Sequence, residues 1–158
     1  MGKGNLATAF EIDQAYQLGR LIGENGWVLL TGGRNVGVMD AASRGAKSVG
    51  GLTIGILPGQ DKTGVSEAVD LAIVTDLGNG RNNINVLSSD VIIACGIGTG
   101  TASEIALALK NNRKVILLAP DKLTTNFFTS LAPEQIFIVD HPQDGINLVK
   151  QFLENGDI

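Results

Sequence analysis

Three observations predict an α/β fold built on a parallel sheet. Short apolar runs rich in Val and Ile alternate with amphipathic segments along the chain. Hydrophobic residues make up 44% of the 158 residues and aromatic residues only 4%, and 21 glycines favour tight turns. We therefore expect a Rossmann-like, doubly wound parallel sheet with helices on both faces, in three layers, within a single domain spanning residues 1–158.

Six apolar runs are the expected strands, at residues 28–31, 52–57, 71–75, 90–95, 114–119 and 136–139. Each run is continuous rather than alternating, which is typical of a strand buried on both faces. Apolar residues at helical spacing predict helices at residues 9–24, 36–49, 82–88, 101–111 and 143–154.

The start of the chain departs from this alternation. Residues 1–8, MGKGNLAT, look like the turn between a first strand and its helix, yet no strand precedes them. The first strand of a doubly wound sheet is central, so without it the adjacent strands expose unpaired N–H and C=O groups. We expect this first strand to be missing from the numbered chain.

Composition excludes several classes of function. The formal charge of -4 and the pI near 4.9 leave no basic stripe for a nucleic-acid backbone. No apolar stretch approaches the ~18 residues of a membrane span, and the N-terminus carries no secretory leader. The single Cys95, inside an apolar run, indicates a buried packing residue and a reducing compartment. We expect a cytoplasmic protein that binds neither nucleic acid nor membrane.

Three glycine turns follow strand positions and should meet at the carboxyl edge of the sheet, where open α/β folds bind ligands. The first turn contains Gly2 and Gly4, the second runs from Thr31 to Asp40, and the third is GIGTGTASE, residues 96–104. Unpaired N–H groups at a helix N-terminus suit a phosphate. A small-molecule phosphate site is therefore the leading interpretation, although the second turn alone is equally consistent with a tight turn.

Charged and amide side chains flank the third turn. Glu104 falls in the first turns of the following helix, where it serves either as a cap or as a general acid/base, metal ligand or hydroxyl acceptor. Arg81 precedes the same strand and could neutralise a phosphate, beside the amides of Asn82, Asn83 and Asn85. No turn has the dinucleotide fingerprint or a P-loop, and the single His141 excludes a histidine triad or a multi-histidine metal site.

The spacing of Arg81, Asp90, Gly98, Gly100, Thr101 and Glu104 resembles the Lonely guy, or "lysine decarboxylase-like", family. That resemblance implies cleavage of the N-glycosidic bond of nucleoside 5′-monophosphates, with Arg81 and Glu104 as the catalytic pair. The enzymes' PGGxGTxxE pattern is altered here, because Ile97 takes the place of a glycine. A branched side chain at that position fills space near the ligand.

A closer resemblance runs through GKG, GWVLLTGGR, TIGILPG, RNNINVLSSD and GIGTGTASEIALALK, nearly the whole chain. These motifs are similar to those of the molybdenum cofactor carrier proteins. The resemblance implies a homotetramer that binds, protects and carries the cofactor, a pterin with a terminal monophosphate, without catalysis, and that exchanges it with enzymes that make or use the cofactor. The implied binding residues are Gly32, Gly33, Arg34, Arg81, Asn82, Asn83, Gly98, Thr99, Gly100, Thr101 and Glu104. Phosphoribohydrolase activity remains the alternative.

Overall fold

The computed structural model of the chain describes residues 1–156 and places a strand at each of the six predicted positions. The strands are β1 (Leu29–Thr31), β2 (Thr53–Leu57), β3 (Leu71–Val74), β4 (Ile92–Cys95), β5 (Val115–Leu118) and β6 (Ile136–Val139). The helices are α1 (Ala9–Glu24), α2 (Gly37–Lys47), α3 (Arg81–Leu87) after a short 3₁₀ turn (Gly78–Gly80), α4 (Thr99–Lys110), α5 (Lys122–Leu131) and α6 (Pro142–Asn155).

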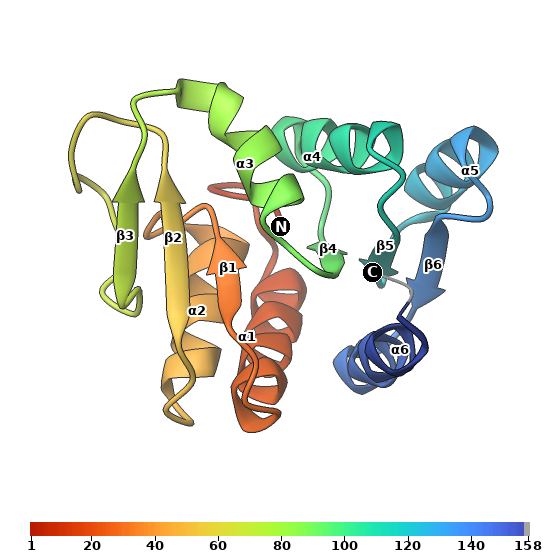
Figure 1. Cartoon of the computed structure of the whole chain (residues 1–158), viewed down its shortest axis with the longest axis horizontal. Coiled ribbons are helices and arrows are strands. Elements are labelled where there is room, and N and C mark those ends of the chain that lie inside the picture. The colour runs from red at the N-terminus through yellow and green to blue at the C-terminus, as the bar shows by residue number, and fades with distance from the viewer. Residues whose placement is uncertain (157–158) are drawn as a thin grey trace.

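All strand pairs are parallel, but they form two three-stranded sheets, β1-β2-β3 and β4-β5-β6, rather than one. The edges β1 and β4 lie toward each other across the centre of the molecule (Figure 1). Residues 1–8 contribute only an isolated parallel bridge from Gly2 to Cys95. The expectation of a missing first strand stays a prediction.

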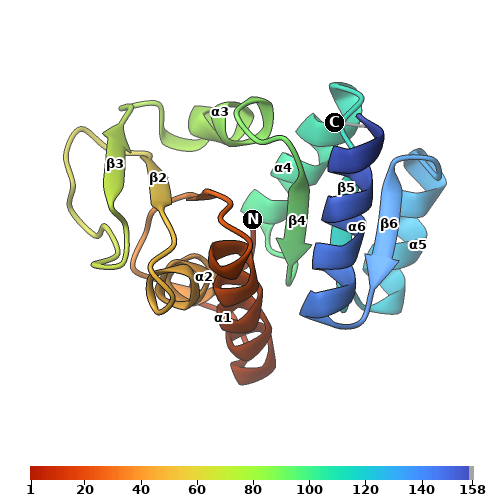
Figure 2. The ribbon, with the colours of Figure 1, turned by 60° about the horizontal axis from the view of Figure 1, so that its bottom comes forward.

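Two hydrophobic clusters on opposite faces of β5 confirm the three-layer arrangement. Ile116 and Leu118 pack into the cluster that contains residues of α1, α2 and α6. Val115 and Leu117 pack into the cluster with residues of α3, α4 and α5. Because successive side chains of a strand point to opposite faces, this alternation requires helices on both sides of the sheet, as Figure 2 shows.

Helix α1 begins at a capping box, in which the Thr8 hydroxyl accepts from the Glu11 backbone N–H and the Glu11 carboxylate accepts from the Thr8 N–H. Its contact with α2 depends on glycine, because a Cβ at Gly19 would lie 2.0 Å from the Ala42 carbonyl oxygen. This close packing places the N-terminus of α2 beside residues 1–5, where the Val38 N–H donates to the Lys3 carbonyl.

Helix α5 was not predicted from the sequence. Its N-cap is Asp121, whose carboxylate accepts from the Thr124 N–H at 2.7 Å. Thr and Asn lower the helix propensity of its sequence, KLTTNFFTSL, and only part of its apolar surface is buried. Phe128 lies in the core, whereas Leu123, Phe127 and Leu131 are exposed.

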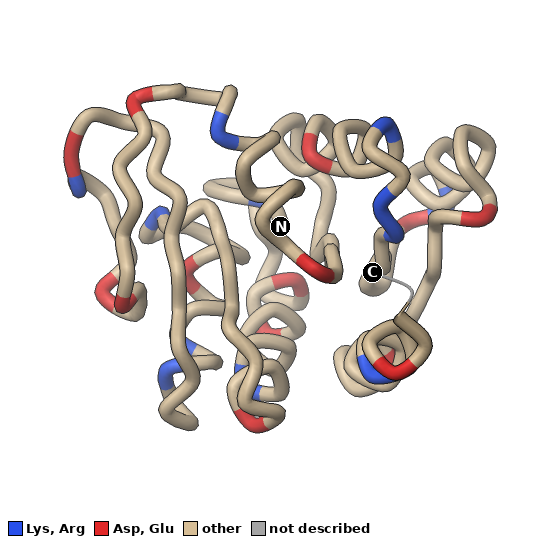
Figure 3. Tube along the Cα trace, viewed as in Figure 1, with Lys and Arg blue, Asp and Glu red and all other residues tan. Residues whose placement is uncertain are grey.

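Acidic and basic residues are interspersed over the surface elements, as expected from the composition (Figure 3). Among residues 1–156, no helix combines the length and the apolar character that a membrane crossing requires.

Candidate functional site

The third glycine turn leads from β4 into α4 and leaves the start of that helix open. Gly98, the N-cap, has an extended backbone and provides no capping side chain. Thr99 and Gly100 are exposed, and a Cβ at Gly100 would meet no atom within 4 Å. The first N–H groups of α4 therefore face open space, with the positive end of the helix dipole behind them.

Two polar side chains of α4 are buried behind this turn. Glu104 is 6% exposed, and its Oε1 accepts a hydrogen bond of 2.8 Å from Nδ2 of Asn85 on α3. Thr101 is 2% exposed, and its hydroxyl has no hydrogen-bond partner. The Oδ1 of Asn85 is also buried without a partner. A buried polar atom without a partner costs about 1–3 kcal/mol, so these two atoms are available for hydrogen bonds to a bound molecule.

Arg81, the first residue of α3, reaches back to the second glycine turn. A Cβ built on Gly32 would lie 2.5 Å from one terminal nitrogen of Arg81 and 2.7 Å from the other. Only glycine leaves room for the guanidinium in this position. The Nε of Arg81 is buried without a partner, which adds a donor to the unpaired acceptors beside it.

The electrostatics around Arg81 favour an added negative charge. Burial lowers the pKa of its guanidinium, the charge of Glu104 raises the pKa, and the charge of Arg34 lowers it again. Within residues 1–156, neither arginine forms an ion pair. Arginine stays protonated despite such a shift, so the two cations Arg34 and Arg81 lie close enough to affect each other, with the carboxylate of Glu104 also near Arg81.

One cavity of about 1160 Å³ brings most of the predicted residues together. The predicted residues that line it are Gly32, Arg34, Arg81, Asn82, Gly98, Thr99, Gly100, Thr101 and Glu104, and Asn85 joins them. The cavity also takes in residues 1–6, which carry the first glycine turn. The three glycine turns therefore meet at the carboxyl edge of the sheets, as predicted.

Gly33 and Asn83 do not line this cavity. Gly33 has a left-handed φ of 70°, and a Cβ there would lie 2.9 Å from the Gly55 backbone, so its role is to let two turns approach. Asn83 is exposed on α3, where the helical period turns it away from Asn82 and Asn85. Asn79 and Met39 line the cavity without having been singled out from the sequence. Asn79 belongs to no glycine turn, and Met39 lies within the second turn but is apolar and offers no group typical of a phosphate site.

Cys95 also lines the cavity and is 2% exposed, which confirms a buried thiol. Burial raises its pKa to about 11, so the thiol stays protonated and unreactive at neutral pH.

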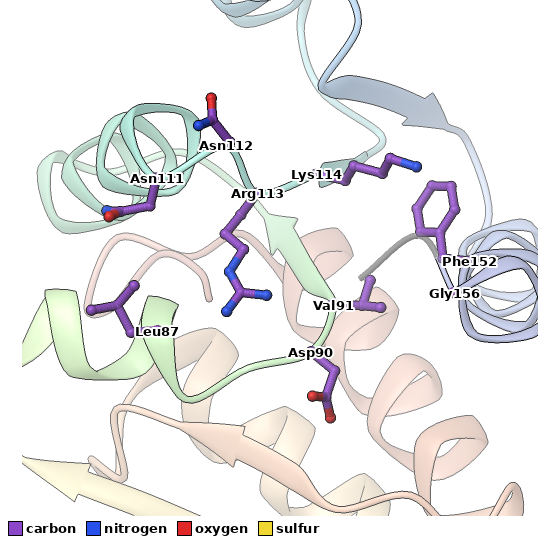
Figure 4. Close-up of a pocket in the computed structure, with 9 residues that line it drawn as sticks. All are labelled: Leu87, Asp90, Val91, Asn111, Asn112, Arg113, Lys114, Phe152 and Gly156. Carbon is purple, nitrogen blue, oxygen red and sulfur yellow. The ribbon is translucent and has the colours of Figure 1, made fainter.

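A second cavity, of about 580 Å³, lies at the opposite, amino-terminal end of β4 and β5 (Figure 4). Lys114 extends over the Phe152 ring, 4.7 Å from its centroid, and Arg113 extends toward Leu87 and Asp90. Ligands of open α/β sheets bind at the carboxyl ends of the strands. The first cavity, with its unpaired polar atoms, is therefore the candidate site.

Together these groups suit a phosphorylated, partly polar ligand. The N-terminus of α4 offers backbone N–H donors to a phosphate, and Arg34 and Arg81 offer positive charge. The side-chain amides of Asn82 and Asn85 can form hydrogen bonds with the edge of a heterocycle. Glu104 can accept a hydroxyl or amine proton from the same ligand.

Comparisons with known proteins agree with this architecture. A family model described as the SLOG cluster4 family matches residues 1–146. The structure of the molybdenum cofactor binding protein from the phototrophic bacterium Rippkaea orientalis is 60% identical, with a TM-score of 0.95 over 97% of this chain and 94% of that chain. The molybdenum cofactor carrier protein from Chlamydomonas reinhardtii is 46% identical, with a TM-score of 0.93 over 98% of this chain and 95% of that chain.

A more distant relative is an enzyme. The cytokinin riboside 5′-monophosphate phosphoribohydrolase from Mycobacterium tuberculosis is 26% identical over 85% of this chain and 83% of that protein. The comparisons thus include both molybdenum cofactor proteins and an enzyme of nucleoside monophosphates.

Proposed function

The chain belongs to the SLOG cluster4 family, and we propose that it binds, protects and carries molybdenum cofactor without changing it chemically. Support comes from the 60% and 46% identity to a cofactor-binding protein and a cofactor carrier, each matched over almost its full length. The enzyme relative, at 26% identity, is more distant.

The observation that carries the proposal is the convergence of unpaired buried polar atoms on one cavity. Arg81 Nε, Asn85 Oδ1 and Thr101 Oγ1 all lack partners there. The cofactor is a pterin with a terminal monophosphate and an oxidation-sensitive dithiolene, so it needs a phosphate cradle, hydrogen bonds to its ring edge and shelter from solvent.

We assign the phosphate to the α4 turn, where Gly98, Gly100 and Thr101 leave donors free. Arg34 and Arg81 would hold oxyanionic groups of the same ligand, since both lack an ion-pair partner within residues 1–156. The predicted ligand contacts of Asn82, Thr99 and Glu104 belong to the same proposal. Gly33 and Asn83 do not line the cavity, so we assign them no direct contact with the ligand.

Two features favour holding a ligand over cleaving it. Ile97 lines the cavity at a position where the enzyme pattern has glycine, so its branched side chain takes space from a substrate. The side chain of Asn85 already donates a hydrogen bond to Oε1 of Glu104, so one of the two carboxylate oxygens is engaged as an acceptor within the protein. Both features leave phosphoribohydrolase activity as the second candidate function.

The test is anaerobic titration of the purified chain with molybdenum cofactor, followed by exposure to air. We expect micromolar or tighter binding and slower oxidation of the bound cofactor than of the free cofactor. Arg81→Gln and Thr101→Val should each weaken binding, and Lys150→Gln, on the exposed face of α6, should not. Absence of binding at micromolar concentrations would refute the proposal.

A panel of nucleoside 5′-monophosphates tests the second function. Release of free base, lost in Glu104→Gln, would establish a hydrolase and replace the carrier proposal. A carrier should release no base from any member of the panel.

The proposed carrier is a homotetramer, and two uncovered apolar surfaces support this. Leu30, Ile54 and Leu71 lie side by side in the parallel register and so share one face of the β1-β2-β3 sheet, on which Leu71 is 52% exposed. In Figure 1 this face carries only α3, near one end. Parallel sheets are almost always covered on both faces. A second copy would provide the cover.

The second surface is the outer stripe of α5, where Leu123, Phe127 and Leu131 recur every four residues with exposures of 80%, 55% and 58%. Two distinct self-complementary interfaces generate a tetramer with D2 symmetry. Light scattering should give a tetramer for the natural chain and for Lys150→Asp. Leu71→Asp and Phe127→Asp should each give dimers, and the double variant monomers. A monomeric natural chain would refute the assembly.

We further propose that the carrier exchanges molybdenum cofactor with the enzymes that make or use it, and that it does so in the cytoplasm. The free, buried Cys95 supports this compartment. Donor and acceptor enzymes that make or use the cofactor would be recovered by crosslinking the loaded carrier and should be absent when Arg81→Gln is used. Cell fractionation tests the compartment.

A further inference from the structure

Lys3, in the first glycine turn, lines the ligand cavity and has a fixed backbone. Its N–H donates to the Cys95 carbonyl at 3.4 Å, and its carbonyl accepts from the Val38 N–H at 3.0 Å. These bonds hold Lys3 between the end of β4 and the start of α2. Its side chain passes the N-cap of α4, because a Cβ on Gly98 would lie 3.6 Å from the Lys3 Cγ. Lys3 therefore adds a cation beside the turn to which we assign the phosphate.

The Lys3 ammonium forms an ion pair with Glu11 of α1, with 3.1 Å between Nζ and Oε1. The Glu11 carboxylate lies against the third glycine turn, since a Cβ on Gly96 would collide with it. The ion pair therefore sits between the first and third glycine turns. A lysine ammonium reaches about 4 Å from its Cγ. Rotation of the Lys3 side chain can therefore carry the ammonium from Glu11 to a phosphate at the start of α4.

Glu11 can release Lys3 because its other carboxylate oxygen is held separately. Oε2 accepts from the Thr8 N–H at 2.7 Å and from the Thr8 hydroxyl at 3.1 Å. The positive end of the α1 dipole stabilises the same carboxylate. The side chains of Lys3 and Glu11 are 26% and 16% exposed, and partly exposed ion pairs contribute little to stability. Exchange of the ammonium from Glu11 to a ligand therefore costs little.

A phosphate monoester calls for more positive charge than the two arginines of the cavity supply. It carries a charge of about −1.5 to −2 at pH 7, whereas Arg34 and Arg81 set against Glu104 leave one net positive charge. The buried hydroxyl of Thr101 offers a hydrogen bond but no charge. Among the described residues that line the cavity, Lys3 is the one further lysine or arginine. A third cation at this turn brings the charge around the phosphate close to balance.

We propose that Lys3 is a phosphate-binding residue, whose ammonium moves from Glu11 to the phosphate monoester at the start of α4 when the ligand binds. Glu11 acts as a positioning residue, which keeps the ammonium beside the turn and competes with the ligand for it. The inference rests on the proposed phosphate site. It holds for any phosphate monoester bound there, whether molybdenum cofactor or a nucleoside 5′-monophosphate.

The test is titration of the full chain with inorganic phosphate at constant ionic strength, which probes this subsite apart from the rest of a ligand. Lys3→Gln should raise the Kd for phosphate at least about tenfold, because a charge-assisted hydrogen bond is lost. Lys3→Arg keeps the charge and should stay within about threefold of the natural Kd. Lys110→Gln is the control, because it removes the same charge at the exposed far end of α4 and should leave the Kd unchanged.

Glu11→Gln separates phosphate binding from a structural role of the ion pair. Glutamine still completes a capping box, so α1 keeps its start, but the charge that competes for Lys3 is gone. Phosphate should bind about two- to fivefold more tightly, and adding Lys3→Gln should abolish this gain. If the ion pair only braced the first glycine turn, both single variants would weaken binding alike, and that result would overturn the proposal. An unchanged Kd in Lys3→Gln, or no measurable binding of phosphate to the natural chain, would also overturn it.

Molybdenum cofactor and adenosine 5′-monophosphate, titrated in the same way, identify the source of the phosphate. Lys3→Gln should weaken cofactor binding at least about tenfold, and an unaffected cofactor Kd would overturn the proposal. If the natural chain failed to bind the cofactor while inorganic phosphate still bound through Lys3, the carrier proposal would fail and this inference would stand. Binding of adenosine 5′-monophosphate through Lys3 in that case would assign the subsite to the second candidate function.

Discussion

Gly32→Ala tests whether the position of Arg81 determines ligand affinity. The added Cβ would lie 2.5 Å from a terminal nitrogen of Arg81, against about 3.4 Å for an ordinary contact. The guanidinium must therefore move by about 0.9 Å, which is enough to break one charge-assisted hydrogen bond. Such a bond contributes about 1.5–3 kcal/mol, so the Kd for molybdenum cofactor should rise about ten- to hundredfold.

The assay is the anaerobic cofactor titration, with Tm measured on the same samples. Gly32 does not have a left-handed φ, so alanine fits its backbone and folding should be little affected. Gly59→Ala is the matched control, because a Cβ there meets no atom within 4 Å. Wild-type affinity in Gly32→Ala, with an unchanged Tm, would refute the assignment of Arg81 to the ligand.

Three further outcomes follow from single side chains. Thr101→Val should leave Tm unchanged or raise it by up to about 3 °C, since it removes an unpaired hydroxyl, while weakening cofactor binding about tenfold by titration. Hydrogen bonds from Lys47 and from Thr53 hold the pKa of Asp70 below its ordinary value of 3.8. The ionised Asp70 therefore stabilises the folded protein above that pH, and this contribution is lost as the pH falls through the folded-state pKa. Asp70→Asn should therefore lower Tm at about pH 6 and flatten its decline toward about pH 3; an unchanged decline would contradict this. The Cys95 thiol should react with iodoacetamide at about pH 8 at least about 100-fold more slowly in the native than in the unfolded chain, and equal rates would contradict its burial.

Periodicity predicted most of the fold because each strand is buried on both faces. The run from Lys114 to Ala119 is continuous in Val, Ile and Leu, and the structure places β5 within it, between two hydrophobic clusters. Helix α5 was missed although Leu123, Phe127 and Leu131 recur at helical spacing, because the Thr and Asn residues of KLTTNFFTSL lower its helix propensity. Its apolar stripe belongs to a surface, which sequence periodicity alone cannot distinguish from a core.

The site was predictable where topology forces residues together. Arg81 and Glu104 flank one strand, and the crossover rule brings both to its carboxyl edge. The contact between Arg81 and Gly32 was not predictable, because it joins two turns whose separation depends on side-chain packing. The hydrogen bond from Asn85 to Glu104 was not predictable for the same reason. Asn85 is buried and Asn83 is exposed because the period of helix α3 turns the two side chains to different faces.

The unpaired polar atoms beside Thr101 also bear on how long the protein survives in a cell. They lower the stability of the ligand-free form, whereas a ligand at 100 times its Kd adds about 2.7 kcal/mol of stability by mass action. Proteases act on the transiently opened form, whose population falls as stability rises. Empty copies of a carrier built in this way would be degraded first, so the amount of protein would follow the supply of its cargo.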